Sequence, residues 1–185
     1  ITSGELVTEK IEETSGSITF SLDDKYFFYS KLDEFHRPRK IFRHKLGTNI
    51  KDDELIFEEK SEAFTVGINL SADEKYFFIT TSDHNTSEQY FFPVNEQKPN
   101  PKLIKKRKKG IIYSLNSWDN YFYCHTNENA EDFKIERCKD LLNQNWEIYI
   151  APKNEVLIGG LTFLDNWIIR AEKSNALGKL FVKNI

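Results

Sequence analysis

The stretch Ser21-Leu22-Asp23-Asp24-Lys25-Tyr26-Phe27-Phe28 joins an aspartate-centred turn directly to an aromatic strand. The pattern recurs three times, as Ser71-Ala72-Asp73-Glu74-Lys75-Tyr76-Phe77-Phe78, Ser117-Trp118-Asp119-Asn120-Tyr121-Phe122-Tyr123 and Leu164-Asp165-Asn166-Trp167-Ile168-Ile169. The central aspartates at positions 23, 73, 119 and 165 are 50, 46 and 46 residues apart. A repeat of this length that is made of strands is typical of β-propeller blades.

Each copy has the order expected of a four-stranded meander. An apolar strand precedes the turn, at Ile18–Phe20, Val66–Leu70, Ile112–Leu115 and Leu161–Phe163. After the aromatic strand, a third strand is predicted at Lys40–His44, Gln89–Pro93, Phe133–Cys138 and Lys179–Val182. The fourth is predicted at Glu54–Glu58, Lys102–Lys105 and Trp146–Ile150, and the last copy stops before it.

These patterns predict an all-β fold, a partial β-propeller of about four blades built from four-stranded antiparallel meanders. The blades are expected at about residues 15–60, 61–108, 109–153 and 154–185. Helical periodicity is poor, and Arg137–Asn143 is the only plausible helical turn. Because blades at the two ends of such an array lack a neighbour, we expect the chain to self-associate or to be marginally stable.

Composition excludes several functional classes. The 185 residues carry 26 basic and 29 acidic side chains, a net charge of -3, so the positive surplus that nucleic-acid binding needs is missing. No apolar run approaches the roughly 18 to 20 residues that span a bilayer. The sequence starts at Ile1, contains no Met and has no signal-peptide pattern, which we interpret as an internal fragment.

The two cysteines, Cys124 and Cys138, are too few for a disulfide framework. The predicted hairpin places Cys124 near Ile135 rather than opposite Cys138. We therefore expect two reduced thiols and a cytoplasmic protein.

No residue is predicted to be catalytic, to bind a cofactor or to hold a metal. The chain has no Gly-x-Ser-x-Gly motif, and the Gly16-Ser17 pair opens a strand without the second glycine. The glycine pair at 159–160 is too isolated to suggest a phosphate-binding loop. The four histidines have no spacing typical of a triad or a zinc site, so surface or packing roles are expected at His36, His44, His84 and His125.

The basic run Lys105-Lys106-Arg107-Lys108-Lys109 is the most conspicuous charge block. Such a run can bind nucleic acid or act as a localisation signal. It lies between the last strand of one copy and the first strand of the next. We interpret it as a solvated connection between blades.

A longer pattern begins with Tyr29-Ser30-Lys31-Leu32-Asp33-Glu34-Phe35-His36-Arg37-Pro38, then Arg43-His44-Lys45-Leu46-Gly47-Thr48 and Asp53-Glu54-Leu55-Ile56-Phe57-Glu58-Glu59. It continues with Thr86-Ser87-Glu88, Trp146-Glu147 and Asp165-Asn166-Trp167. In this order, over residues 15–185, the chain resembles the propeller of the oligopeptidase B group in the prolyl oligopeptidase family of serine peptidases. One departure is Arg170-Ala171-Glu172, where a more acidic segment is usual.

The resemblance implies a seven-bladed propeller that caps an active site and admits only short peptides. It also implies an α/β-hydrolase domain, with the catalytic Ser, Asp and His, that lies outside this chain and past Ile185. The full enzyme is expected to cleave short peptides after Arg or Lys. Its hydrolase domain and peptide substrates would be the partners, with no nucleic acid and no membrane, and the loops Asp33–Arg39 and Asn127–Asp132 are candidate contacts with that domain.

Two other readings of the sequence stay open. The first is a free-standing propeller that acts as an interaction scaffold, although the Gly-His and Trp-Asp signatures of WD40 repeats are absent. The second is a nucleic-acid binder that uses residues 105–109, although the overall charge balance argues against it.

Overall fold

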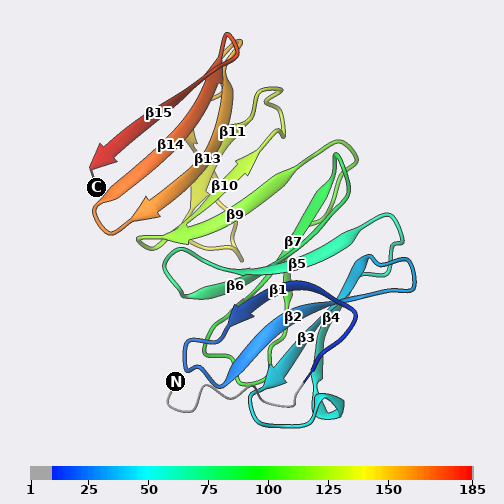
Figure 1. The fold of residues 1–185 in the computed structure, drawn as a ribbon. Helices are drawn as coiled ribbons and strands as arrows, with labels where there is room; N and C mark the ends of the chain where they lie inside the picture. The colour runs from blue at the N-terminus through cyan, green and yellow to red at the C-terminus, as the bar shows by residue number, and fades with distance from the viewer. Residues whose placement is uncertain (1–9, 185) are drawn as a thin grey trace. The chain divides into compact units, whose positions relative to one another are not determined.

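Strands and tight turns account for nearly all of the structure, a computed structural model that describes residues 10–184 (Figure 1). The first two groups of strands are β1 (Thr14–Phe20), β2 (Tyr26–Leu32), β3 (Pro38–Lys45) and β4 (Glu54–Glu58), then β5 (Thr65–Leu70), β6 (Tyr76–Ser82), β7 (Ser87–Pro93) and β8 (Lys102–Lys105). They are followed by β9 (Tyr113–Trp118), β10 (Tyr121–Thr126), β11 (Lys134–Cys138), β12 (Glu147–Ile150), β13 (Leu157–Leu164), β14 (Trp167–Ser174) and β15 (Leu177–Asn184). A 3-10 helix, η1 (Ile50–Asp52), precedes β4.

The strands form four consecutive antiparallel meanders. Their orders are β1-β2-β3-β4, β5-β6-β7-β8, β9-β10-β11-β12 and β13-β14-β15, so the last sheet has three strands within the described residues. The predicted all-β succession of meanders is confirmed. The chain divides into two compact units at Ile68, within β5, and each unit is described by itself below.

In the first two sheets, the repeated serine and aspartate build the turn that begins the aromatic strand. In the second sheet, the Ser71 hydroxyl donates to Asp73 Oδ1 at 2.8 Å and accepts the backbone N–H of Tyr76 at 3.0 Å. Glu74, at the tip, has φ of 56°, a backbone conformation that such turns require. The first sheet repeats the bond, from Ser21 to Asp23 at 2.7 Å. The signature is therefore explained by local turn chemistry.

The aromatic strands carry side chains that are buried on both faces of their sheet. In β6, the consecutive residues Phe77, Phe78 and Ile79 are all buried. Within residues 69–185, two apolar clusters join neighbouring sheets. One links sheets β5–β8 and β9–β12 through Phe78, Phe91, Ile104, Tyr113, Leu115, Phe122, Cys124, Cys138 and Leu141. The other links β9–β12 to β13–β15 through Tyr123, Ile135, Ile158, Phe163 and Ile168.

Polar side chains also tie the second sheet to the third. The Ser87 hydroxyl donates to the Tyr113 carbonyl and accepts its N–H, both at 2.7 Å. Two residues along β7, Gln89 Oε1 accepts the N–H of Leu115 at 2.7 Å. These bonds satisfy backbone groups of β9 that would otherwise be buried and unpaired.

The helical turn considered plausible at Arg137–Asn143 is confirmed only in its second half. Strand β11 runs to Cys138, and a single turn follows in which the Gln144 N–H donates to the Asp140 carbonyl at 2.9 Å. Asp140 Oδ1 caps this turn by accepting the N–H of Leu142 at 2.8 Å. The strand register also differs by one residue from the prediction, since Cys124 lies opposite Glu136 rather than Ile135.

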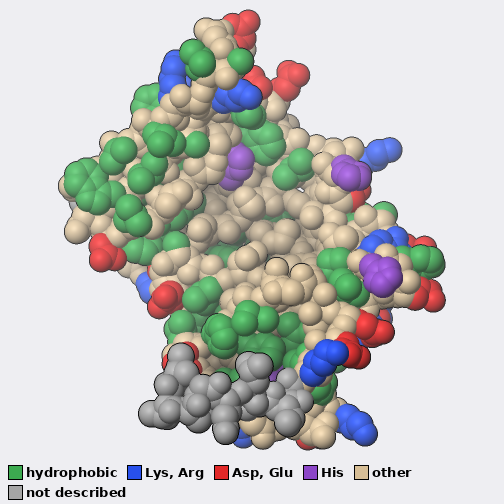
Figure 2. Space-filling view, in the orientation of Figure 1, with side chains coloured by type: hydrophobic (Ala, Val, Ile, Leu, Met, Phe, Trp, Pro, Cys, Tyr) green, Lys and Arg blue, Asp and Glu red, His purple; other side chains and the backbone are tan. Residues whose placement is uncertain are grey.

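The last sheet exposes apolar side chains at its outer edge. Every residue of β15 is exposed, including Leu177, Leu180 and Val182, and Leu164 and Trp167 are exposed nearby. Figure 2 shows hydrophobic side chains gathered on the left of the view, over β13–β15. The sheet therefore resembles a core element with one side uncovered.

The glycine pair in β13 provides a stability prediction. A Cβ at Gly159 would lie 2.9 Å from the Ala171 carbonyl oxygen, whereas one at Gly160 would meet nothing within 4 Å. Gly159→Ala is expected to lower the free energy of unfolding by about 1–3 kcal/mol, because β14 approaches too closely for an added methyl group. Gly160→Ala, the matched control, should stay within about 0.5 kcal/mol of the wild type. Urea titration measures both, and equal values would contradict the packing of β13 on β14.

Candidate functional site

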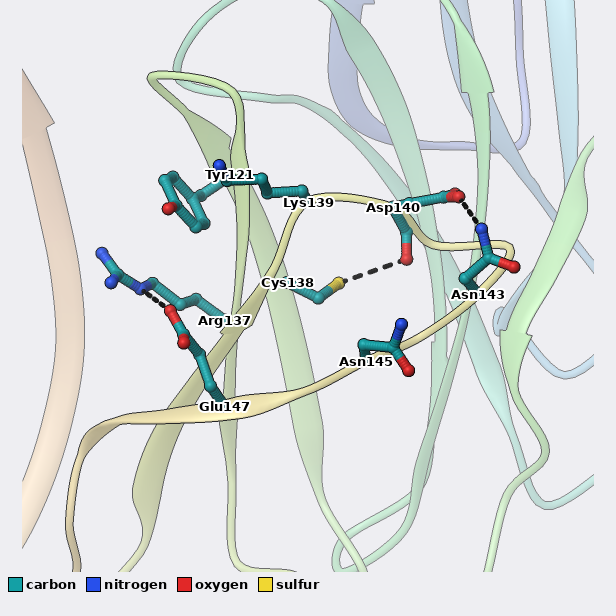
Figure 3. Close-up of a pocket in the computed structure, with 8 residues that line it drawn as sticks. All are labelled: Tyr121, Arg137, Cys138, Lys139, Asp140, Asn143, Asn145 and Glu147. Atoms are coloured by element: carbon teal, nitrogen blue, oxygen red, sulfur yellow. Dashed lines mark hydrogen bonds and ion pairs between the residues drawn. The ribbon is translucent and has the colours of Figure 1, made fainter.

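A polar cavity lies beside the loop that joins β11 to β12 (Figure 3). It encloses about 430 Å³ and is lined by Tyr121, Arg137, Cys138, Lys139, Asp140, Asn143, Asn145 and Glu147. Tyr121 lies at the start of β10, and Arg137 and Cys138 lie at the end of β11. The loop between β11 and β12 contributes Asp140, Asn143 and Asn145. Antiparallel pairing of β10 with β11 places these segments side by side around the cavity.

Most charges around this cavity are already paired. Arg137 Nε donates to Glu147 Oε1 at 2.7 Å, and the guanidinium lies 4.3 Å from the Tyr121 ring centroid. The Lys139 ammonium lies 5.2 Å from the same ring. Asp140 holds the turn by accepting a hydrogen bond from the Asn143 side chain. The cavity can hold a small polar group by hydrogen bonding.

The thiol of Cys138 points to the Asp140 carbonyl, to which Sγ donates at 3.5 Å (Figure 3). Burial raises the pKa of Cys138 to about 11. A thiol that stays protonated at neutral pH is a poor nucleophile. No histidine lines the cavity to act as its base, so the arrangement favours binding over covalent catalysis.

Both cysteines are unpaired and buried, and burial also raises the pKa of Cys124 to about 12. The thiolate is the reactive form. We therefore expect a disulfide-exchange reagent such as Ellman's reagent to label neither thiol in the folded protein at pH 8. Both thiols should react in 6 M guanidinium chloride, which serves as the control. Fast labelling of one thiol before unfolding would contradict this burial.

The four histidines do not come together. His36 and His84 are exposed in the loops after β2 and β6. His125 stacks on Phe133 with ring centroids 4.6 Å apart, and its Nε2 donates to the Ile158 carbonyl at 2.7 Å. Burial lowers the pKa of His125, so the neutral ring is a packing element between two sheets.

His44 belongs to a buried network that sequence reasoning missed. Its Nδ1 donates to Asp53 Oδ1 at 2.6 Å, and the Tyr29 hydroxyl donates to Asp53 Oδ2 at 2.8 Å. The His44 and Asp53 side chains are only 1% and 3% exposed. Such burial prevents contact with a substrate, so the network serves structure. Pairing of β2 with β3 and the helical turn η1 bring the three residues together, and no local motif could have signalled it.

Most of the basic residues at 105–109 form ion pairs with glutamates of the same chain. Arg107 donates to the buried Glu88 through its backbone N–H at 2.8 Å and through Nη2 at 2.9 Å. Lys108 Nζ donates to Glu128 at 2.6 Å, and Lys105 lies 4.8 Å from the Trp146 ring centroid. The run is thus a connection between β8 and β9 whose cations are mostly paired, rather than a free cationic patch.

Metal and membrane features are lacking in the described part of the chain. In residues 10–184, no three His, Cys, Asp or Glu side chains gather as a metal ion would require. Over the same residues, no helix has the length and apolar character to cross a bilayer.

Comparison with known proteins identifies the repeat. A family model described as the prolyl oligopeptidase N-terminal beta-propeller domain matches residues 1–185. The chain is 34% identical over 186 residues to Protease 2 of Moraxella lacunata, covering 98% of this chain and 27% of that protein. It is 26% identical over 183 residues to dipeptidyl aminopeptidase BI of Pseudoxanthomonas mexicana, covering 97% and 25%. The chain thus spans about a quarter of the length of these curated relatives.

Solved structures show the same fold. Oligopeptidase B from Trypanosoma brucei superposes with a TM-score of 0.90 at 21% identity, covering 97% of this chain and 26% of that one. Oligopeptidase B from Leishmania major also gives 0.90, at 19% identity, covering 98% and 26%. The predicted partial β-propeller is therefore confirmed.

Proposed function

Because the chain belongs to the family of prolyl oligopeptidase N-terminal beta-propeller domains, we propose that it forms part of the gate of a serine oligopeptidase. The resemblance to the oligopeptidase B group is confirmed by the similarity to Protease 2 and to two oligopeptidase B structures. In this proposal the parent protein supplies the α/β-hydrolase domain that carries the catalytic residues. The propeller segment controls which peptides reach it.

The observation that carries the proposal is a match over the whole chain to the N-terminal beta-propeller domain of prolyl oligopeptidases. Rigidity supports the same role. Sheets joined by two apolar clusters and by side-chain hydrogen bonds make a wall that resists deformation by an incoming protein. A wall of this kind selects substrates by size, because folded proteins cannot pass an opening that short peptides can.

We further propose that the parent enzyme cleaves short peptides after Arg or Lys in the cytoplasm. Two unpaired cysteines fit a reducing compartment. The segment Asp33–Arg39, whose residues 33–37 form the loop between β2 and β3, is a candidate contact with the hydrolase domain. Asp33 accepts the N–H groups of Phe35 and Arg37, each at 2.9 Å, so the loop presents an ordered surface. Loop 127–132 is the second candidate.

The test compares the chain alone with the full-length parent. Purified residues 1–185 should not hydrolyse an arginyl chromogenic peptide, whereas the parent should hydrolyse it and leave a folded protein substrate intact. Proteolytic nicking of loop 33–37 or 127–132 in the parent should raise its rate on the large substrate relative to the small one. The proposal would be refuted if the chain alone hydrolysed the peptide and substitution of one of its histidines abolished that activity.

A free-standing interaction scaffold is the second candidate. The exposed apolar residues of β15, such as Leu180 and Val182, favour it, since such surfaces often mark protein contacts. Sequencing of the coding region after Ile185 separates the two functions. A Gly-x-Ser-x-Gly stretch within a few hundred residues supports the peptidase, and its absence supports the scaffold.

A further inference from the structure

A second, larger cleft lies where the aspartate turns of the last three sheets meet, within residues 69–185. It encloses about 630 Å³. We call it the turn cleft and define it by six of its lining residues: Asp73, Glu74, Trp118, Phe163, Asp165 and Trp167. Three aromatic rings and three carboxylates therefore share its lining, together with Ala72, Leu164 and Asn166.

The carboxylates differ in whether the chain already uses them. Asp73 is committed, since it accepts the hydroxyls of Ser71 and Ser117, each at 2.8 Å, and lies 3.7 Å from Lys75 Nζ. Glu74 and Asp165 are exposed, and neither makes an ion pair with a lysine or arginine of residues 10–184. The cleft thus keeps two negative charges available to a ligand.

The two indole rings of the cleft, Trp118 and Trp167, also lack a charged partner among the described residues. Trp118 stacks on Phe163, with ring centroids 5.9 Å apart and ring planes at 25°. Other aromatic rings of this chain hold one of its own cations, as Tyr121 holds Arg137 at 4.3 Å and Phe181 holds Arg170 at 4.6 Å. Within the described residues, neither Trp118 nor Trp167 has such a cation over its ring.

From this combination we propose that the turn cleft binds the cationic side chain of a basic peptide. An indole face attracts an ammonium or guanidinium group, most strongly where water is partly excluded, and a carboxylate at the edge adds a charged hydrogen bond. Charge complementarity selects the occupant, because an anionic or neutral peptide gains neither contact. The inference rests on the proposed function for its role, which is to concentrate Arg- and Lys-bearing peptides at the gate.

Tryptophan fluorescence gives a direct assay, since two of the three tryptophans of the chain, Trp118 and Trp167, line the cleft. The probe is acetyl-Ala-Arg-Ala-Arg-Ala-amide, and its uncharged match replaces both arginines with citrulline. The arginine peptide should give a saturating signal and bind about tenfold more tightly than the citrulline peptide. Raising the salt concentration from 20 to 500 mM should reduce this difference in affinity, because the higher concentration screens exposed charges.

Two variants locate the binding. Glu74→Gln with Asp165→Asn should weaken the arginine peptide about tenfold and leave the citrulline peptide unchanged. The matched control, Glu131→Gln with Glu155→Gln, removes the same charge from exposed residues outside the cleft and should change affinity less than about twofold. All four side chains are exposed, so circular dichroism should confirm an unchanged fold.

Equal affinity for the two peptides, or full affinity in the Glu74/Asp165 variant, overturns the inference. The assay uses this chain alone, so its outcome is separate from that of the proposed function. If the arginine peptide binds this chain but the parent enzyme does not select substrates by size, the proposed gate is refuted and the turn-cleft inference stands. If the parent enzyme selects by size but the peptide does not bind this chain, the gate stands and the turn-cleft inference is refuted.

Discussion

Asp53→Ala is expected to lower the free energy of unfolding by about 3 kcal/mol, because it leaves two buried donors without an acceptor. Asp53 Oδ1 accepts His44 Nδ1 at 2.6 Å, and Oδ2 accepts the Tyr29 hydroxyl at 2.8 Å. Burial and the bond to Asp53 raise the pKa of the Tyr29 phenol above its ordinary value, so it stays a donor at neutral pH. Neither donor can reach water when the acceptor is removed.

Equilibrium urea unfolding monitored by circular dichroism measures this change. Asp52→Ala is the matched control. The Asp52 carboxylate is exposed, so its removal should change the free energy of unfolding by less than about 0.5 kcal/mol. A second variant, Tyr29→Phe, removes one donor and leaves His44 paired, so its cost should be smaller, about 1 kcal/mol. If Asp53→Ala is as mild as Asp52→Ala, the buried network does not hold the first sheet together.

Glu88→Ala should also cost about 3 kcal/mol, since it removes a buried carboxylate that accepts three hydrogen bonds. The Glu88 side chain is 6% exposed and accepts Arg107 Nη2 at 2.9 Å, the Arg107 N–H at 2.8 Å and the Tyr90 hydroxyl at 2.7 Å. Glu147→Ala is the matched control. It breaks an equivalent Arg–Glu pair at 2.7 Å whose glutamate is 57% exposed, and it should cost less than about 1 kcal/mol.

The same carboxylate predicts a pH dependence. Burial alone would raise the pKa of Glu88, but hydrogen bonds from Arg107 and Tyr90 outweigh it and hold that pKa below its ordinary value. The stability from Glu88 is therefore fully present above about pH 4.3, the ordinary glutamate pKa, and is lost as the pH falls through the lower folded-state pKa. Glu88→Gln should lack this part of the acid destabilisation. Identical acid profiles for the variant and the wild type would contradict it.

Local patterns predicted the repeat because its turn chemistry is contained in a few adjacent residues. Ser71, Asp73 and Tyr76 form their bonds within one turn, so their spacing alone indicates the structure. Strand limits were harder, as β13 begins at Leu157 rather than Leu161, because strand length depends on the neighbour that it pairs with. The helical turn considered at Arg137–Asn143 is limited to the bond from Gln144 to Asp140 for the same reason, since pairing with β10 keeps the chain in β11 up to Cys138.

Candidate sites were predicted less well. The sequence marked the basic run at Lys105–Lys109 as a solvated connection, yet Arg107 is paired with a glutamate 19 residues earlier in the chain. It also gave no signal for the polar cavity beside Tyr121 or for the turn cleft. Each of these combines side chains from segments that only strand register and sheet stacking bring together.

The amino-acid sequence alone is enough to predict consecutive antiparallel meanders with aspartate turns and aromatic strands. Side-chain alternation and turn hydrogen bonds act over a few residues, so the local sequence pattern is sufficient to predict them. Which polar groups come together depends on the tertiary structure, as for Tyr29 with Asp53 and Glu88 with Arg107. The same holds for the turn cleft, whose lining includes both Glu74 and Trp167. Those encounters depend on register and on stacking between sheets, and a one-residue shift in either would separate the groups.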